Sequence, residues 1–335
     1  MKRWKLSLLC IGLFLSPLSA FAQTKPVELS YSIFFPASHK HAVLASEWAK
    51  EIGEKTNGRV KITLFPSGTL TPADKCYDGV VKGISDIGMS CFGYTRGKFP
   101  LTEVIDLPLG YKSGAAATKL INEYYIKLKP RELAEAKVMY LHAHGPGFLH
   151  TKKAVYKLED VKGMKIRSTG LSAKVVSALG GIPVAMPMGE TYDALSRGVA
   201  EGSMAPIESL EGWKWGEVVK FTTQSYGSAY STGFFVVMNM EKWNALPPDI
   251  QKVIEKANGE WAEKTGKLWD EIDKSGREFS LKLGNKIISL PKEEDARWAR
   301  AVKPILDEYT ANMKGKGLPG GEALKFCLER LEKHP

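Results

Sequence analysis

Arg167, in the segment KGMKIRSTG, is the side chain in this sequence best suited to hold a small anion. A guanidinium is planar, keeps its charge at physiological pH and can bind a carboxylate through two parallel hydrogen bonds. A lone arginine near the end of a strand is more often part of a surface ion pair. Its surroundings must therefore decide between a structural role and a ligand-binding role.

Motifs of catalysis are absent from the sequence. It contains no G-x-S-x-G elbow, no H-E-x-x-H motif and no P-loop, and GGIPVAMPMGE lacks the spacing of a dinucleotide-binding turn. Cys91 lies in the apolar run GMSCFGY, where cysteine usually acts as a small buried hydrophobe. We therefore expect a protein that is not an enzyme and that needs no cofactor.

Two pairs of histidines suggest metal binding as an alternative. His39 and His41, like His142 and His144, are two residues apart, which places both rings on one face of a strand. The first pair is expected at a loop-to-helix junction, where such residues diverge, and no acidic or histidine-rich loop supports either pair. We therefore favour a structural role or a hydrogen bond to the ligand for these histidines. A periplasmic metal-binding module that uses His142 and His144 is the alternative.

Composition and charge indicate an exported globular protein. The 335 residues are 44% hydrophobic, enough for two core-bearing domains, and the net charge of +10 is spread without a basic run typical of nucleic-acid binding. The segment MKRWKLSLLCIGLFLSPLSAFAQT predicts a secretory signal, residues 1–22, and a periplasmic location. No later stretch is long enough to span a membrane. Whether Cys76 and Cys91 form a disulfide is left open.

Strands and helices alternate along the chain, which predicts βαβ units and mainly parallel sheets. Residues 27–34 and 60–65 alternate as strands do, and Thr71 in TPAD is expected to cap a helix. The pattern begins again at Ser172, which indicates a second α/β unit. A strand at 231–239 and a helix of on the order of 50 Å, ending near Lys282, are too long for one unit. We therefore predict a two-lobed α/β fold with a crossing strand, a long hinge-spanning helix and a cleft at the carboxyl ends of the strands.

Five segments, in order and in register, closely resemble the periplasmic solute-binding subunits of TRAP transporters, the tripartite ATP-independent, ion-driven importers. They read FFPASHKHAVLASEWAKEIGEKTNGRVKITLFPSGTL, YDGVVKGISDIGMSCFGYTRGKFPLTEVIDLPLGY, DVKGMKIRSTG, PMGETYDALSRGVAEG and VMNMEKWNALPPDIQKVIEKA. The resemblance runs from about Glu28 past Trp261. A single segment of this kind would be weak, whereas five in register are specific.

The resemblance implies two lobes that close on an organic acid, with Arg167 at the position of the family's carboxylate-binding arginine. It places lobe I at residues 23–147 and 236–275, and lobe II at residues 148–235 and 276–335. The implied partners are a small organic acid and a membrane permease made of a small and a large integral subunit. We expect a monomer that binds no nucleic acid.

Several positions depart from the sugar-acid-binding members of this family. Gly147 stands where they often have a second arginine, and Ala205 in EGSMAP stands where they have an asparagine. The resemblance places further candidate ligand contacts at Phe34, Ser90, Cys91, Tyr94, His144, Met188 and Trp213. A hydroxylated sugar acid would leave polar groups unsatisfied in such a pocket, at about 1 to 3 kcal/mol each. This predicts a monocarboxylate with an aromatic or branched apolar body, its acid on Arg167, with Tyr94 and His144 available to hydrogen-bond an oxo, hydroxy or amino group.

The remaining acids and aromatics of these segments are expected to have structural roles. Glu190 falls at the start of a helix, Trp215 is expected to pack, and Asn239 is expected to support the hinge. Glu201 is a second acid that recurs in the family pattern. A protein that hands its bound ligand to a membrane receptor would have the same sequence features, and this sensory role is a further alternative.

Overall fold

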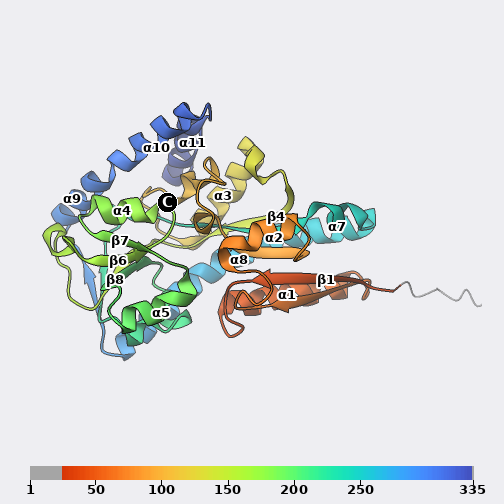
Figure 1. Ribbon diagram of the computed structural model, residues 1–335, viewed down its shortest axis with the longest axis horizontal. Coiled ribbons are helices and arrows are strands. Elements are labelled where there is room, and N and C mark those ends of the chain that lie inside the picture. Colours follow the sequence, from red (N-terminus) through yellow and green to blue (C-terminus); the bar gives the residue numbers. More distant parts are fainter. Residues whose placement is uncertain (1–24, 334–335) are drawn as a thin grey trace, which may run out of the picture.

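The computed structural model describes residues 25–333, so the predicted signal segment lies outside the described residues. These residues form two mixed β-sheets with helices packed around them (Figure 1). The strands are β1 (Val27–Ile33), β2 (Val60–Phe65), β3 (Ile87–Cys91), β4 (Ala136–Ala143), β5 (Phe148–Thr151), β6 (Lys165–Ser168), β7 (Ile182–Ala185), β8 (Gly202–Ala205), β9 (Phe221–Gln224), β10 (Gly233–Asn239) and β11 (Lys286–Ser289). The helices are α1 (Lys40–Lys55), α2 (Cys76–Val81), α3 (Gly114–Leu128), α4 (Ser172–Ala178), α5 (Met188–Ser196), α6 (Ser209–Gly212), α7 (Met240–Ala245), α8 (Pro248–Lys282), α9 (Lys292–Val302), α10 (Pro304–Gly315) and α11 (Gly320–Lys333).

The sheet of the first lobe has the order β2-β1-β3-β10-β4. Strand β1 pairs in parallel with β2 and β3, whereas β10 is antiparallel to both of its neighbours. The alternation of the sequence explains how β1 packs, since Tyr31 and Ile33 are buried and the ring of Tyr31 meets that of Trp48 on α1 edge-on at 5.8 Å. The predicted cap at Thr71 is wrong, because its hydroxyl lies 2.6 Å from that of Ser32. A short 3₁₀ helix (Ala73–Lys75) begins after Pro72 without a side-chain cap and leads into α2.

The sheet of the second lobe has the order β11-β9-β5-β8-β6-β7. Here β5 is antiparallel to β8 and β9, while β6 is parallel to β7 and β8. Each sheet therefore contains one strand that runs against the others. The predicted mixed, mainly parallel α/β architecture is confirmed by this arrangement.

Within residues 25–333, the chain crosses between the two lobes in three places before it reaches the C-terminal helices. It passes from β4 to β5 and from β9 to β10, and an isolated bridge between Gly147 and Tyr230 joins these two connections. The third crossing is α8, whose 35 residues pack against α1, α3 and β4 of the first lobe and then against α6 and β11 of the second (Figure 1). The strand β10 lies within the first sheet, and the segment just before it makes the crossing.

The C-terminal helices pack on both lobes. Helices α9 and α10 contact α4 of the second lobe, whereas α11 lies against α3 of the first. The residue boundaries proposed for the lobes stay a prediction. No helix among residues 25–333 is both long enough and apolar enough to cross a membrane.

Candidate ligand-binding site

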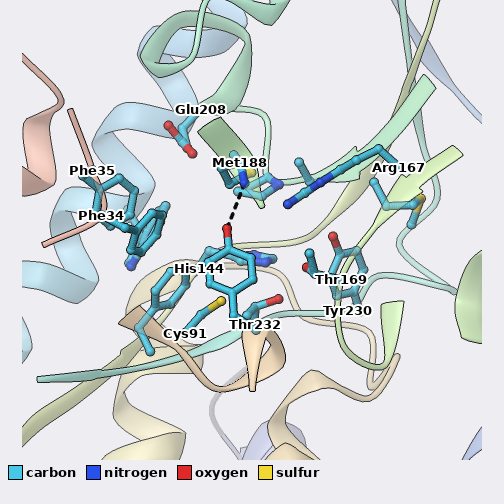
Figure 2. A pocket seen from close by; sticks show the side chains of 16 residues that line it. Phe34, Phe35, Cys91, His144, Arg167, Thr169, Met188, Glu208, Tyr230 and Thr232 are labelled. Atoms are coloured by element: carbon cyan, nitrogen blue, oxygen red, sulfur yellow. Dashed lines mark hydrogen bonds between the residues drawn. The ribbon is translucent and has the colours of Figure 1, made fainter. Parts of the chain in front are cut away.

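A small cavity of about 30 Å³ lies between the two lobes. Its lining comes from both sheets (Figure 2). The lining residues are Phe34, Phe35, Cys91, Tyr94, His144, Arg167, Thr169, Met188, Met204, Ala205, Pro206, Glu208, Tyr230, Thr232, Phe234 and Trp269. We refer to this space as the cleft cavity.

Strand direction explains why these residues meet. Cys91 is the last residue of β3, Arg167 lies near the end of β6, and Met188 begins the helix that follows β7. His144 directly follows β4, and Glu208 comes three residues after β8. The carboxyl ends of the parallel strands of both sheets thus face the same cavity, where α/β folds usually bind ligands.

Arg167 is buried in this cavity, with 2% of its surface exposed. Its Nε donates to the carbonyl oxygen of Met186 at 3.0 Å, and its Cζ lies 5.7 Å from the ring centre of Trp215. Its Nη2 is buried without a hydrogen-bond partner among the described residues, and none of their acidic side chains forms a salt bridge with it. A buried charged donor without an acceptor is costly, so the arrangement suits an anion that enters from outside.

Tyr94 connects the two lobes beside this arginine. Its hydroxyl oxygen accepts a hydrogen bond from the backbone nitrogen of Met188 at 3.1 Å (Figure 2). Burial raises the pKa of the Tyr94 hydroxyl, while the positive charge of Arg167 opposes that rise. The hydroxyl therefore stays protonated at neutral pH and can still donate one hydrogen bond.

His144 offers an acceptor to the cavity. Its Nδ1 lies 2.5 Å from the carbonyl oxygen of Gly145, and because a carbonyl only accepts, Nδ1 carries the proton. Burial lowers the pKa of His144 to about 4, so the ring is neutral at physiological pH. Nε2 is then the unprotonated nitrogen, which can accept a hydrogen bond.

Glu208 is a second buried charged residue of the cavity. It is 2% exposed, and its Oε2 lies 3.1 Å from Nε2 of His39 in the first lobe. The contact joins the lobes, because Glu208 follows a strand of the second sheet. Sequence reasoning missed Glu208; its place just after β8, at the carboxyl end of a parallel strand, is the signal that could have found it.

Aromatic side chains form one wall of the cavity. Phe34 stacks on Phe35 with 4.2 Å between ring centres and meets Tyr94 edge-on at 5.6 Å. Trp213 does not line the cavity; it stacks against Phe34 at 6.1 Å. Ser90 does not line it either, since its hydroxyl donates to the carbonyl oxygen of Ala73 at 2.7 Å.

Six of the eight predicted contacts therefore meet in the cavity. They are Phe34, Cys91, Tyr94, His144, Arg167 and Met188. Burial raises the pKa of the Cys91 thiol, which keeps it protonated and weakly polar. Cys76 and Cys91 are both free and buried.

Gly147 explains why the cavity has one arginine. A Cβ at this position would lie 2.2 Å from Cε1 of Tyr230. The Tyr230 ring thus fills the space that a side chain at position 147 would need. Ala205, the other departure, lines the cavity and is buried.

The histidine pairs do not build a metal site. No group of three or more His, Cys, Asp or Glu side chains among residues 25–333 could hold a metal ion. His142 instead accepts a hydrogen bond from Trp269 Nε1 at 3.1 Å and stacks on Phe234 at 4.8 Å. This gives no support to the alternative of a metal-binding module.

The other residues considered at the sequence level lie away from the cavity. Glu190 is exposed in the first turn of α5, and Glu201 accepts from the backbone nitrogen of Lys165 at 3.1 Å. Trp215 is buried beneath the guanidinium of Arg167. Asn239 caps α7, accepting from the backbone nitrogen of Lys242 at 3.0 Å.

Two α/β lobes with a cavity between them, and a buried arginine that lacks an acidic partner there, define a two-lobed ligand-binding protein. Residues 32–312 match the DctP family, described as bacterial extracellular solute-binding protein, family 7. The chain belongs to this family.

Individual relatives are similar over most of their length. A TRAP solute-binding protein from a marine metagenome, specific for aromatic acids and solved with 3-hydroxybenzoate, is 30% identical with a TM-score of 0.88, and the match covers 92% of this chain and 99% of that one. One from Rhodoferax ferrireducens T118, solved with copurified benzoate, is 29% identical with a TM-score of 0.86, covering 92% and 98%. The 2,3-diketo-L-gulonate-binding periplasmic protein YiaO of Escherichia coli K12 is 26% identical over 90% of this chain and 98% of its own.

Proteins of this family bind solutes in the periplasm and are not enzymes. TRAP members bind small organic acids and work with membrane permease components. The predicted family, the two-lobed fold and the non-enzymatic role are confirmed by these comparisons.

Proposed function

We propose that this chain captures a monocarboxylate with an aromatic or branched apolar body in the periplasm and delivers it to a TRAP permease made of a small and a large membrane subunit. The observation that carries the proposal is the buried Nη2 of Arg167, which has no partner among the described residues and belongs to a side chain that lines the cleft cavity. In this role the guanidinium binds the ligand's carboxylate without chemical change.

The apolar body of the ligand is inferred from the rest of the lining. Phe34, Phe35 and Phe234 form a stacked group, with ring centres 4.2 to 6.3 Å apart, on one side of the cavity. Flat or branched apolar groups pack well against such rings. Those hydroxyls of a uronic acid that meet these rings would instead lose the hydrogen bonds they make in water. The relatives solved with benzoate and 3-hydroxybenzoate support this choice.

The lobes must close around the ligand for this function. Two polar contacts, between Tyr94 and Met188 and between His39 and Glu208, already join the lobes beside the cavity. A ligand shifts the equilibrium between open and closed forms only by binding the closed form more tightly. The carboxylate bond to Arg167 supplies that difference, since it is formed away from water.

Isothermal titration calorimetry with the purified protein tests the proposal. The panel contains benzoate, 2-oxoisovalerate, succinate and glucuronate. We expect benzoate or 2-oxoisovalerate to bind at least about 100-fold more tightly than glucuronate, which corresponds to two unsatisfied hydroxyls at about 1.4 kcal/mol each. Tighter binding of succinate or glucuronate than of both benzoate and 2-oxoisovalerate would contradict the proposed ligand class.

A further inference from the structure

The cleft cavity contains hydrogen-bond acceptors that a ligand carboxylate cannot satisfy. Glu208 Oε2 is bonded to His39, but Oε1 has no hydrogen bond within residues 25–333. His144 carries its proton on Nδ1, which leaves Nε2 as a second acceptor. A ligand carboxylate has no proton to donate at neutral pH, so it can bond Arg167 but neither of these two atoms.

Glu208 and Arg167 lie apart around the cavity. Figure 2 shows Arg167 on one side, beyond Met188, and Glu208 on the side of Phe34 and Phe35. Both side chains are 2% exposed, so a ligand held between them has little water to compensate an unmatched charge. The end of the ligand that binds Arg167 is therefore distinct from any group that meets Glu208.

His39 holds the carboxylate of Glu208 in place. The 3.1 Å contact to Oε2 fixes the side chain, and His39 is itself buried as the N-cap of α1. The backbone nitrogen of Glu208 donates to Asp273 on α8 at 2.9 Å, which anchors the same residue from the other side. An acceptor fixed in this way can select a ligand group by its geometry and charge.

We propose that Glu208, together with His144, selects monocarboxylates that carry a hydroxyl or amino donor on the part of the molecule remote from the carboxylate. This inference rests on the proposed function, because it assumes an acid held by Arg167. A donor bonded to the Glu208 carboxylate gains a charge-assisted hydrogen bond in a site closed to water. A second carboxylate at that end would meet a like charge, so dicarboxylates are rejected.

The test compares ligands that differ only in the remote group. Calorimetry measures benzoate, 3- and 4-hydroxybenzoate, 3- and 4-aminobenzoate, 3-methoxybenzoate and isophthalate with the wild-type protein and with Glu208→Gln. In the wild type, at least one of the hydroxybenzoates or aminobenzoates should bind about tenfold or more tightly than benzoate and 3-methoxybenzoate, and isophthalate should bind most weakly. In Glu208→Gln the ratio of the affinity for the donor-bearing acid to the affinity for benzoate should fall toward one. The affinity for isophthalate should rise relative to that for benzoate.

A matched variant controls for the loss of one negative charge. Glu211→Gln removes an exposed carboxylate from α6, three residues further along, where Glu211 bonds the hydroxyl of Ser275. It should keep the wild-type preference. A general closure defect in Glu208→Gln would weaken all acids by the same factor and leave the ratios unchanged, which would overturn the inference.

The outcomes separate the two proposals. Equal binding of benzoate and all donor-bearing acids by the wild type would overturn the role of Glu208 and leave the proposed monocarboxylate function intact. An unchanged preference in Glu208→Gln would do the same. If no monocarboxylate binds the wild type, the proposed function fails, and the inference that depends on it fails as well.

Discussion

The hydroxyl oxygen of Tyr94 accepts a hydrogen bond from the backbone nitrogen of Met188 at 3.1 Å, and this bond spans the cleft beside Arg167. Tyr94 follows the third strand of the first sheet, whereas Met188 begins α5 of the second lobe. One phenol thus touches the opposite lobe and lines the ligand cavity. Closure and ligand binding share this group, which makes it a direct probe of their coupling.

Tyr94→Phe should weaken ligand binding without unfolding the protein. The ring keeps its edge-on contact with Phe34, but the backbone nitrogen of Met188 loses its acceptor when the lobes close. A buried donor left without a partner costs about 1 to 3 kcal/mol, so affinity for benzoate should fall about 5- to 150-fold. Calorimetry measures the affinity, and small-angle scattering with saturating ligand should show a larger open fraction. Unchanged affinity would show that this bond does not contribute to closure.

Arg167→Met should separate binding from stability. The substitution removes the carboxylate contact, so affinity should fall by about 2 to 5 kcal/mol, the usual cost of breaking a buried charged pair. The unliganded protein should become more stable by about 1 kcal/mol, because a buried donor without a partner is replaced by an apolar chain of similar length. Urea unfolding without ligand measures the second effect. Reduced stability together with unchanged affinity would show that Arg167 has a purely structural role.

The sequence predicted the elements better than the contacts between them. Hydrophobic periodicity located β2 (Val60–Phe65) and the long α8 (Pro248–Lys282), because such patterns depend on neighbours along the chain. The contact between His39 and Glu208 joins residues 169 positions apart, and no local pattern reports it. It depends on how the two lobes meet.

The misplaced contacts have a local physical reason. Ser90 and Cys91 are consecutive residues of β3, so their side chains point to opposite faces of the sheet. Cys91 lines the cavity, and Ser90 therefore turns away to bond Ala73. Trp213 stacks on Phe34, which lines the cavity, but does not itself line it. The resemblance to a family could locate the segment but could not tell which of two adjacent side chains faces the ligand.

His41→Leu should reduce the sensitivity of stability to acid. Both ring nitrogens of His41 are buried without partners among the described residues, and burial together with His142 and His39 holds its pKa well below the usual value. Between that folded-state pKa and the unfolded value of about 6.5, the unfolded chain binds a proton that the folded chain does not. The free energy of unfolding therefore decreases as pH falls below about 6.5, by up to about 1.4 kcal/mol per pH unit for this residue.

The comparison of the two proteins isolates that contribution. Burial raises the pKa of Asp106 and Asp273, which stabilises the folded state as pH falls, but this opposite effect is common to both proteins. Urea unfolding at pH 8, 6 and 5 should give similar stabilities at pH 8 and a shallower loss for His41→Leu below pH 6.5. If the free energy of unfolding depends on pH in the same way in both proteins, His41 does not contribute to the acid sensitivity.

Gly170→Ala should block closure of the lobes. A Cβ on Gly170 would lie 2.9 Å from Cα of Gly93 in the first lobe, and backbone atoms there cannot rotate away as a side chain could. Gly170 also has a φ of +52°, so part of the cost is backbone strain of about 1 kcal/mol, which is unrelated to closure. Gly163→Ala is the matched control, since Gly163 has a φ of +76° in the same lobe and its Cβ would meet nothing within 4 Å. Both variants should lose similar stability without ligand, but only Gly170→Ala should lose benzoate affinity, by tenfold or more, about 1.4 kcal/mol. Equal affinity of the two variants in calorimetry would show that the bound form does not need these two glycines in contact.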